Sequence, residues 1–240
     1  MRLDALDERQ REAATHGDEP LLIVAGAGTG KTTTLAHRVA HLIERGVRPE
    51  RILLLTFARR AAAELLRRVD GLLHGGSRER AASGRVWGGT FHAVATRLLR
   101  LHGEHIGLHP GFTIHDRADS EDLLDVLRAE LQLARGDRRF PRKATCADIY
   151  SRCVNAREPL EALLDRVFPW CKEHGDGLKR LFRTYTDRKA EQHVLDFDDL
   201  LVFLEGLLAD PAAGPIVRGR FDAVLVDEYQ DTNALQADLL

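Results

Sequence analysis

The sequence has 240 residues, of which 44% are hydrophobic and 30% charged, so the chain is long enough for one large or two ordinary globular domains. Its 35 basic and 37 acidic side chains leave a net charge of −2, and overall charge therefore gives no argument for binding to nucleic acid. No apolar run approaches the roughly 20 residues of a membrane span, no signal peptide opens the chain, and the three cysteines lack CxxC spacing, which together favour a reducing, cytoplasmic setting without a membrane partner.

Strand and helix patterns alternate in the first part of the chain. A helical pattern at 3–16 is followed by a short apolar run at 21–25, which predicts a buried strand bounded by glycines. The later elements follow in the order helix 31–45, strand 51–57, helix 58–69, strand 86–91 and helix 92–102. This alternation favours a parallel sheet covered by helices on both faces.

The alternation stops near Gly103 and returns only with "FDAVLVDE" at 221–228. Helical patterns with almost no strand signal fill the interval. The predicted fold class is therefore α/β, with a parallel sheet that is incomplete and interrupted by an inserted helical domain. We expect the first part of the α/β domain at 1–105, the helical insertion at 106–195 and the return to the first domain at 196–240.

The stretch "AGAGTGKT", residues 25–32, fits the phosphate-loop pattern [AG]xxxxGK[ST] between a predicted strand and a predicted helix. Its glycines allow backbone N–H groups to approach phosphates closely, because a Cβ would obstruct that approach. Lys31 would bind the β- and γ-phosphates, and the Thr32 hydroxyl would be a ligand of Mg²⁺. The alternative is a glycine turn that merely joins strand to helix, and the strand–loop–helix context argues against it.

A second candidate site, which is acidic, follows the apolar run 223–226. A phosphate loop needs a carboxylate on a neighbouring strand to hold the metal, and Asp227 is placed for that role. Glu228 beside it is placed to orient and deprotonate an attacking water. The alternative is an acidic strand end that faces solvent, which becomes a poor explanation once the phosphate loop is present.

Five motifs, in this order, resemble those of the UvrD/Rep-type superfamily 1 DNA helicases. "LDERQREAA" (6–14) is similar to the Q motif, "ILLLTFARRAA" (52–62) to motif Ia, and "GTFHAVATRLLR" (89–100) to the GTFH motif. "DFDDLL" (196–201) resembles the acidic motif that returns the chain to the first domain, and "VLVDEYQDTN" (224–233) resembles DExxQD. The resemblance implies a P-loop NTPase fold, with a RecA-like domain 1A interrupted by a helical domain 1B.

The resemblance also assigns roles to individual residues. Lys31, Glu228 and Gln230 would act in ATP hydrolysis, with Gln230 coupling nucleotide state to the motor, and Thr32 and Asp227 would hold Mg²⁺. The remaining assignments form two sets. The ATP-binding set is Gln10, which would read the adenine edge, with Ala25, Gly26, Ala27, Gly28, Thr29, Gly30, Lys31, Thr32 and Thr33. The set facing single-stranded DNA is Thr56, Phe57, Arg59, Arg60, Thr90, Phe91 and His92.

The function that the resemblance implies is that of an ATP-dependent DNA helicase, with ATP and Mg²⁺ as cofactors and single-stranded DNA and single/double-strand junctions as partners. Three departures limit it. Arg59 and Arg60 replace the Asn and Lys of many relatives, Thr33 replaces an arginine thought to sandwich the adenine, and everything after motif II is absent. We therefore expect the other helicase domains C-terminal to this segment, and little hydrolysis by the segment alone, because a missing arginine on the transferring phosphoryl group costs about 10³–10⁵ in rate.

Other interpretations stay open. A stand-alone module that binds nucleotide or single-stranded DNA without turnover would also explain the chain length, and an unrelated P-loop enzyme such as a kinase agrees less well with the GTFH and DExxQD motifs. The four histidines at 102, 105, 109 and 115 favour a surface linker over a metal site, and the basic run 138–143 is either a solvated face or a DNA contact. Asp196, which precedes an apolar helix, is expected to be an N-cap.

Overall fold

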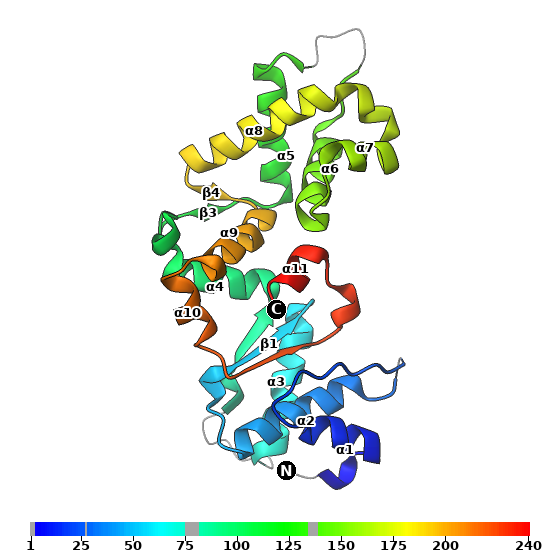
Figure 1. Ribbon diagram of the computed structural model, residues 1–240, viewed down its shortest axis with the longest axis vertical. Helices are drawn as coiled ribbons and strands as arrows, with labels where there is room; N and C mark the ends of the chain where they lie inside the picture. The colour runs from blue at the N-terminus through cyan, green and yellow to red at the C-terminus, as the bar shows by residue number, and fades with distance from the viewer. Residues whose placement is uncertain (1–2, 27, 75–81, 134–138) are drawn as a thin grey trace. The chain divides into compact units, whose positions relative to one another are not determined.

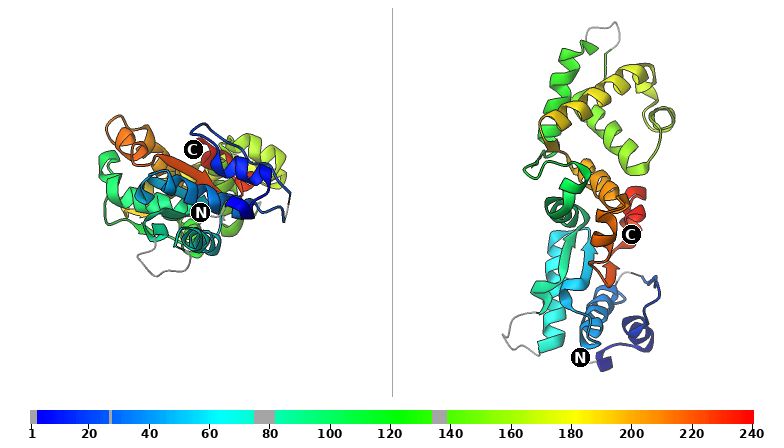
Figure 2. Two further views of the ribbon diagram at one scale, coloured as in Figure 1. Left: turned by 90° about the horizontal axis from the view of Figure 1, so that it is seen from below. Right: turned by 60° about the vertical axis from the view of Figure 1, so that its left-hand side comes forward.

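A computed structural model of the protein describes residues 3–26, 28–133 except 75–81, and 139–240 (Figures 1 and 2). The chain forms two compact units. Unit 1 contains Met1–Val94 with Pro215–Asp231, and unit 2 contains Ala95–Gly214 with Thr232–Leu240. No helix in the described part of the chain is long and apolar enough to cross a membrane.

Unit 1 is built on a three-stranded parallel sheet of order β2-β1-β5. The strands are β1 (Ile52–Thr56), β2 (Trp87–Thr90) and β5 (Ala223–Val226). In the register Leu54 lies between Gly88 and Leu225, so a strand near the end of the sequence pairs with one near its beginning. The predicted parallel sheet, shared by the two halves of the chain, is confirmed.

Two helices, α2 (Lys31–Glu44) and α3 (Arg59–His74), pack on one face of this sheet. Both have apolar residues at helical spacing, which gives each a side to bury. Helix α1 (Glu8–Thr15) lies against α2 (Figure 1). The buried core on this face is formed by Ala36, Val39, Ala40, Leu42, Ile52, Leu54, Leu65, Val69, Val86 and Leu225. Short 3-10 turns occur at Leu3–Ala5, Pro49–Arg51, Ala82–Arg85 and Tyr229–Asp231.

The buried strand predicted at 21–25 is wrong, because these residues form no strand and are largely exposed. Leu22 is 68% exposed and Val24 86% exposed. Strand β1 already has a neighbour on each side, and residues 21–25 pair with neither outer strand of the described sheet. A strand is stabilised by hydrogen bonds to a neighbour and by packing on its faces, so an apolar run without either remains an extended segment.

Unit 2 is mainly helical. Its longer helices are α5 (Arg117–Glu130), α6 (Lys143–Ala156), α7 (Leu160–Arg166), α8 (Gly175–Glu191) and α9 (Phe197–Ala209) (Figure 2). Helix α11 (Ala234–Asp238) is short, 3-10 turns occur at Gly103–Ile106 and Pro169–His174, and strands β3 (Thr113–Ile114) and β4 (Val194–Leu195) form a parallel pair. Helices α4 (Phe91–His102) and α10 (Ala213–Arg218) begin in one unit and end in the other. The core of the helical group is formed by Leu124, Leu127, Ile149, Leu163, Leu164, Leu178, Leu181 and Tyr185.

Asp196 caps α9, as expected, through a bond of 2.8 Å from the Asp199 N–H to its side chain. The same two carboxylates also hold a buried lysine that the sequence analysis did not foresee. Lys189, 2% exposed, places its Nζ 2.5 Å from Asp196 Oδ2 and 2.6 Å from Asp199 Oδ2. Burial, with the nearby charge of Asp196, raises the pKa of Asp199 to about 6. A buried ionic cluster therefore lies at the start of α9.

Candidate nucleotide-binding site

The phosphate-loop segment enters α2 through two glycines with left-handed backbones. Gly28 has φ 75° and Gly30, the N-cap of α2, has φ 86°. This region strongly favours glycine because a Cβ would meet the neighbouring carbonyl oxygen. These two backbones lead the chain into the N-terminus of α2, and the first N–H groups of a helix favour anions. Ala27, which belongs to the predicted ATP-binding set, lies outside the described residues.

Lys31, the first residue of α2, turns its side chain back onto the loop. Its Nζ donates to Ala25 O at 3.0 Å and to Gly26 O at 3.2 Å. The Thr29 hydroxyl donates to Gly26 O at 2.7 Å, which stabilises the same turn. In the described parts of the chain no carboxylate forms an ion pair with Lys31, so its charge is available to an anion.

Gln10 is brought onto the loop from α1. Its side chain completes a capping box with Asp7, and its Nε2 donates to Thr29 O at 2.9 Å. The approach is close, because a Cβ added to Gly30 would lie 2.7 Å from Gln10 Nε2. The residue predicted to read the adenine edge therefore contacts the loop predicted to hold the phosphates.

The next two residues of α2 are the half-buried Thr32 and Thr33. Thr33, where the resemblance led us to expect an arginine, accepts a hydrogen bond of 3.3 Å at its Oγ1 from Arg68 on α3. Arg68 also pairs with Glu64 one helical turn earlier. Arg68 is not among the residues predicted from the sequence, although its i,i+4 spacing from Glu64 indicates a side chain held by an ion pair.

The acidic pair lies at the carboxyl end of β5. The Asp227 N–H donates to Leu55 O at 2.9 Å, and the residue is only 8% exposed. Burial raises the pKa of Asp227, the adjacent Glu228 raises it further, and the positive charge of Lys31 opposes both. Glu228 has a left-handed φ of 52°, and its side chain accepts a hydrogen bond from Gln230. Non-glycine residues in this conformation cost free energy and are concentrated at functional sites.

The chemistry of these side chains is of the kind that a nucleoside triphosphate with a divalent cation requires. Lys31, which forms no ion pair among the described residues, and the N-terminus of α2 favour phosphate, and the positive charge of Lys31 partly offsets the raised pKa of Asp227. Burial and the adjacent Glu228 both disfavour ionisation of Asp227, and a bound cation would oppose them. Mg²⁺ prefers oxygen ligands, and the side chains of Asp227 and Thr32 are of that kind.

The residues predicted to face DNA begin at the carboxyl ends of β1 and β2. Phe57 is 37% exposed and its ring centroid lies 5.9 Å from that of Phe91, which is only 4% exposed. Thr56 is 1% exposed and donates to Ala58 O at 3.0 Å, while Thr90 Oγ1 accepts from the Ala93 N–H at 3.3 Å. Arg59 and Arg60 are exposed at the start of α3, and His92 is half-buried on α4. Phe57 therefore offers an accessible ring, whereas Phe91 packs beside it.

Two minor interpretations can be compared with the structure. Within the described ranges no group of three or more His, Cys, Asp or Glu side chains could hold a metal ion. His109 stacks on His193 at a ring-centroid distance of 4.4 Å, and His102 stacks on His105 at 6.4 Å. Of the basic run 138–143, position 138 lies outside the described residues, and Arg139 and Arg142 are exposed.

Comparison with known proteins identifies the family. The family described as "UvrD/REP helicase N-terminal domain" matches residues 6–240. The ATP-dependent DNA helicase UvrD1 of Mycobacterium leprae is 38% identical over 98% of this chain and 29% of its own length. The ATP-dependent DNA helicase PcrA of Staphylococcus epidermidis is 33% identical over 98% of this chain and 31% of its own length, and a probable DNA helicase II homolog of Mycoplasma capricolum is 32% identical over 99% and 32%. The chain thus spans about 30% of the length of these relatives, and it belongs to the UvrD/REP helicase family, whose N-terminal domain it matches.

Proposed function

We propose that this chain is the ATP-binding N-terminal portion of a DNA helicase that couples Mg-ATP hydrolysis to movement on single-stranded DNA and to unwinding of duplexes. The observation that supports this most strongly is that unit 1 contains both Lys31, held against its glycine turn, and the Asp227–Glu228 pair at the carboxyl end of β5. Relatives named as ATP-dependent DNA helicases match the chain over almost its whole length.

In the proposed reaction each side chain has a separate task. Lys31 would release its bonds to the loop carbonyls and bind the β- and γ-phosphates, while Gln10 would bind the adenine edge. Thr32 and Asp227 would hold Mg²⁺, which when bound neutralises charge on the phosphates. Glu228 would orient the attacking water and accept its proton, with Gln230 holding the carboxylate.

We propose a single-strand track at the carboxyl ends of β1 and β2. The exposed ring of Phe57 would stack on bases without regard to their identity, which is typically worth about 1–3 kcal/mol per base. Arg59 and Arg60 would bind DNA phosphates and His92 would contact the strand nearby. Since Thr56, Thr90 and Phe91 are buried or hydrogen-bonded within the protein, their part in the proposal is to support Phe57 and its neighbours. Single/double-strand junctions are the proposed site of unwinding.

The domain assignment is also a proposal. We assign 1–105 and 196–240 to domain 1A and 106–195 to the helical domain 1B, with the other motor domain C-terminal to this segment. Complete hydrolysis would need arginines supplied by that domain, because a P-loop site alone lacks the charge that stabilises the transferring phosphoryl group.

The test compares this chain with the longer protein encoded by its reading frame. We expect the longer protein to hydrolyse ATP faster in the presence of single-stranded DNA, and the 240-residue chain to show no stimulated turnover above background. A reading frame that stops after Leu240, together with DNA or nucleotide binding without turnover, would instead support a stand-alone binding module. Strong DNA-stimulated turnover by the 240-residue chain would contradict the proposed need for a second domain.

A further inference from the structure

The last turn of α6 holds two other helices of unit 2 through one asparagine. Asn155 Nδ2 donates to Asp198 Oδ1 on α9 at 2.6 Å. Its Oδ1 accepts from Asn233 Nδ2 at 2.7 Å, and Asn233 is the N-cap of α11. The two ends of a single amide group therefore serve as donor to one helix and acceptor from another, which an aspartate or a hydrophobic residue could not do.

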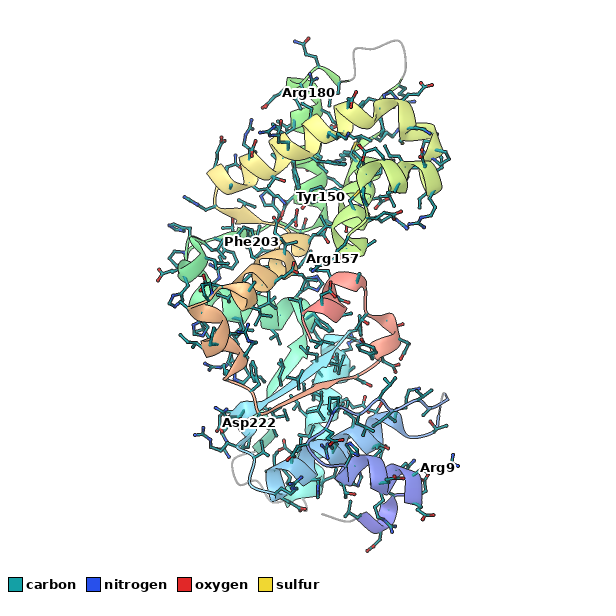
Figure 3. All side chains as sticks on the ribbon, viewed as in Figure 1. Arg9, Tyr150, Arg157, Arg180, Phe203 and Asp222 are labelled. Carbon is teal, nitrogen blue, oxygen red and sulfur yellow. The ribbon has the colours of Figure 1, made fainter. Side chains whose placement is uncertain are left out.

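A second residue repeats this arrangement two positions later. Arg157, the C-cap of α6, has a left-handed φ of 53°. Its Nε lies 2.9 Å from Asp238 Oδ2 on α11, and its Nη2 donates to Glu205 on α9. Figure 3 labels Arg157 at this end of α6, beside α9 and α11. We call Asn155 and Arg157 the α6 clamp, because each of them binds both of the other helices.

The clamp holds the segment that directly follows the acidic pair. Unit 1 ends at Asp231 and unit 2 resumes at Thr232, so only four residues separate Glu228 from the clamped Asn233. Asn233 is itself well held, since its side chain accepts from the Gln236 N–H at 2.8 Å in a capping box. On the other side of Glu228, the Asp227 N–H is fixed to Leu55 O. The left-handed Glu228 therefore lies one residue after a backbone contact of unit 1 and five residues before the clamped Asn233.

We propose that Asn155 and Arg157 are positioning residues for Glu228 and Gln230, which they hold by fixing the chain immediately after them. This inference rests on the proposed ATP hydrolysis. Asn155 and Arg157 are not proposed to contact the nucleotide. The clamp instead makes α6, in the helical unit, respond to the state of the nucleotide site, because a movement of residues 228–231 pulls on Asn233 and on its partners.

The substitution Asn155→Asp tests the donor role, because a carboxylate can still accept from Asn233 Nδ2 but cannot donate to Asp198. It replaces the amide with a carboxylate beside Asp198, whose pKa is already raised by burial, so the two groups repel each other. In the longer protein we expect kcat for DNA-stimulated hydrolysis to fall on the order of 10- to 100-fold, since a displaced catalytic group costs that much. The KM for ATP should change less than about twofold, because the phosphate loop is untouched.

Hydrogen exchange provides a readout that a merely structural role would not produce. Binding of a non-hydrolysable ATP analogue should change exchange in the last turn of α6 in the wild type, and the change should be absent in Asn155→Asp. Arg166→Ala is the matched control, because it removes an exposed ion pair with Glu158 in the same unit and should alter neither result. If Asn155→Asp does not fold, Asn155→Ala, which removes the contacts of the amide without adding a charge, replaces it with the same expectation.

An unchanged kcat in a folded clamp variant, or an exchange response at α6 that survives the substitution, would overturn the proposal. Absence of DNA-stimulated hydrolysis in the wild-type protein would instead refute the proposed function, and the two failures are therefore distinguishable. A double-mutant cycle adds a further check. Asn155→Ala and Asn233→Ala should lower kcat non-additively if they act as one contact, and additive losses would count against the clamp.

Discussion

The side chain of Gln230 donates a hydrogen bond to the carboxylate of Glu228, two residues earlier, while Glu228 holds a left-handed backbone. The bond fixes the orientation of the carboxylate at the carboxyl end of β5. It also links two residues of the stretch DEYQD, 227–231, that the proposed reaction uses for different purposes, one as a base and the other as a coupling group.

Removal of this hydrogen bond should affect turnover more than nucleotide binding. We expect Gln230→Ala to lower kcat for ATP by about tenfold in the longer protein, since an unsupported carboxylate samples other rotamers. Glu228→Gln should lower kcat much further, because an amide cannot accept the proton of the attacking water. Steady-state kinetics with single-stranded DNA separates the two effects, and a tenfold rise in KM with unchanged kcat would contradict both.

Phe57 should contribute to single-strand affinity independently of sequence. Phe57→Ala removes an exposed ring, and we expect a loss of about 1–3 kcal/mol, or roughly 5- to 150-fold in Kd, with a similar loss on different sequences. Fluorescence anisotropy with labelled oligonucleotides measures this directly. Val126→Ala, an exposed aliphatic residue on α5, is the control. Equal affinity of Phe57→Ala and wild type would remove Phe57 from the track.

Lys189 should be essential for the stability of the helical unit. Burial alone would lower the pKa of Lys189, but the carboxylates of Asp199 and Asp196 outweigh burial and raise it. Lys189→Met leaves two buried carboxylates without their cation, and we expect a loss of about 3–5 kcal/mol in the free energy of unfolding. Lys179→Met removes an exposed pair with Glu161 and should cost less than about 1 kcal/mol. Denaturant titration compares the two, and equal costs would show that the buried cluster has no special role.

The raised pKa of Asp199 predicts a pH dependence of stability. Its pKa is about 6 in the folded chain against an ordinary value of 3.8, so between these values the folded state binds more protons than the unfolded state. The free energy of unfolding should therefore fall as pH rises from about 4 to about 6, and this contribution should be constant above that range. Asp199→Asn should flatten the slope in this window. A variant with the same slope as the wild type would assign the effect to another group.

Local patterns in the sequence predicted much of this architecture. The glycine loop, the strand ahead of Asp227 and the capping role of Asp196 depend on residues close together in the chain, and the structure confirms the sheet and the cap. The strand expected at 21–25 was wrong, because strand formation depends on a neighbour that a local pattern does not reveal.

Other features depend on contacts between distant residues. The clamp joins residues 155 and 233, and the local sequence around either residue does not predict this contact. The burial of Lys189 did leave a signal. Leu178, Leu181 and Tyr185 precede it at spacings of three and four residues, and one more helical turn places Lys189 on the same buried face. A lysine at an apolar helical position indicates that buried carboxylates are near.

If Lys31 and the Asp227–Glu228 pair form one Mg-ATP site, Lys31→Ala should disable it. The substitution removes the ammonium group that lies on the glycine loop, and Lys172→Ala, which removes an exposed pair with Asp165, is the matched control. DNA-stimulated ATP hydrolysis by the longer protein should fall by about 10²–10³ or more in Lys31→Ala and remain at wild-type level in Lys172→Ala. Near-normal hydrolysis by a folded Lys31→Ala protein would contradict the account.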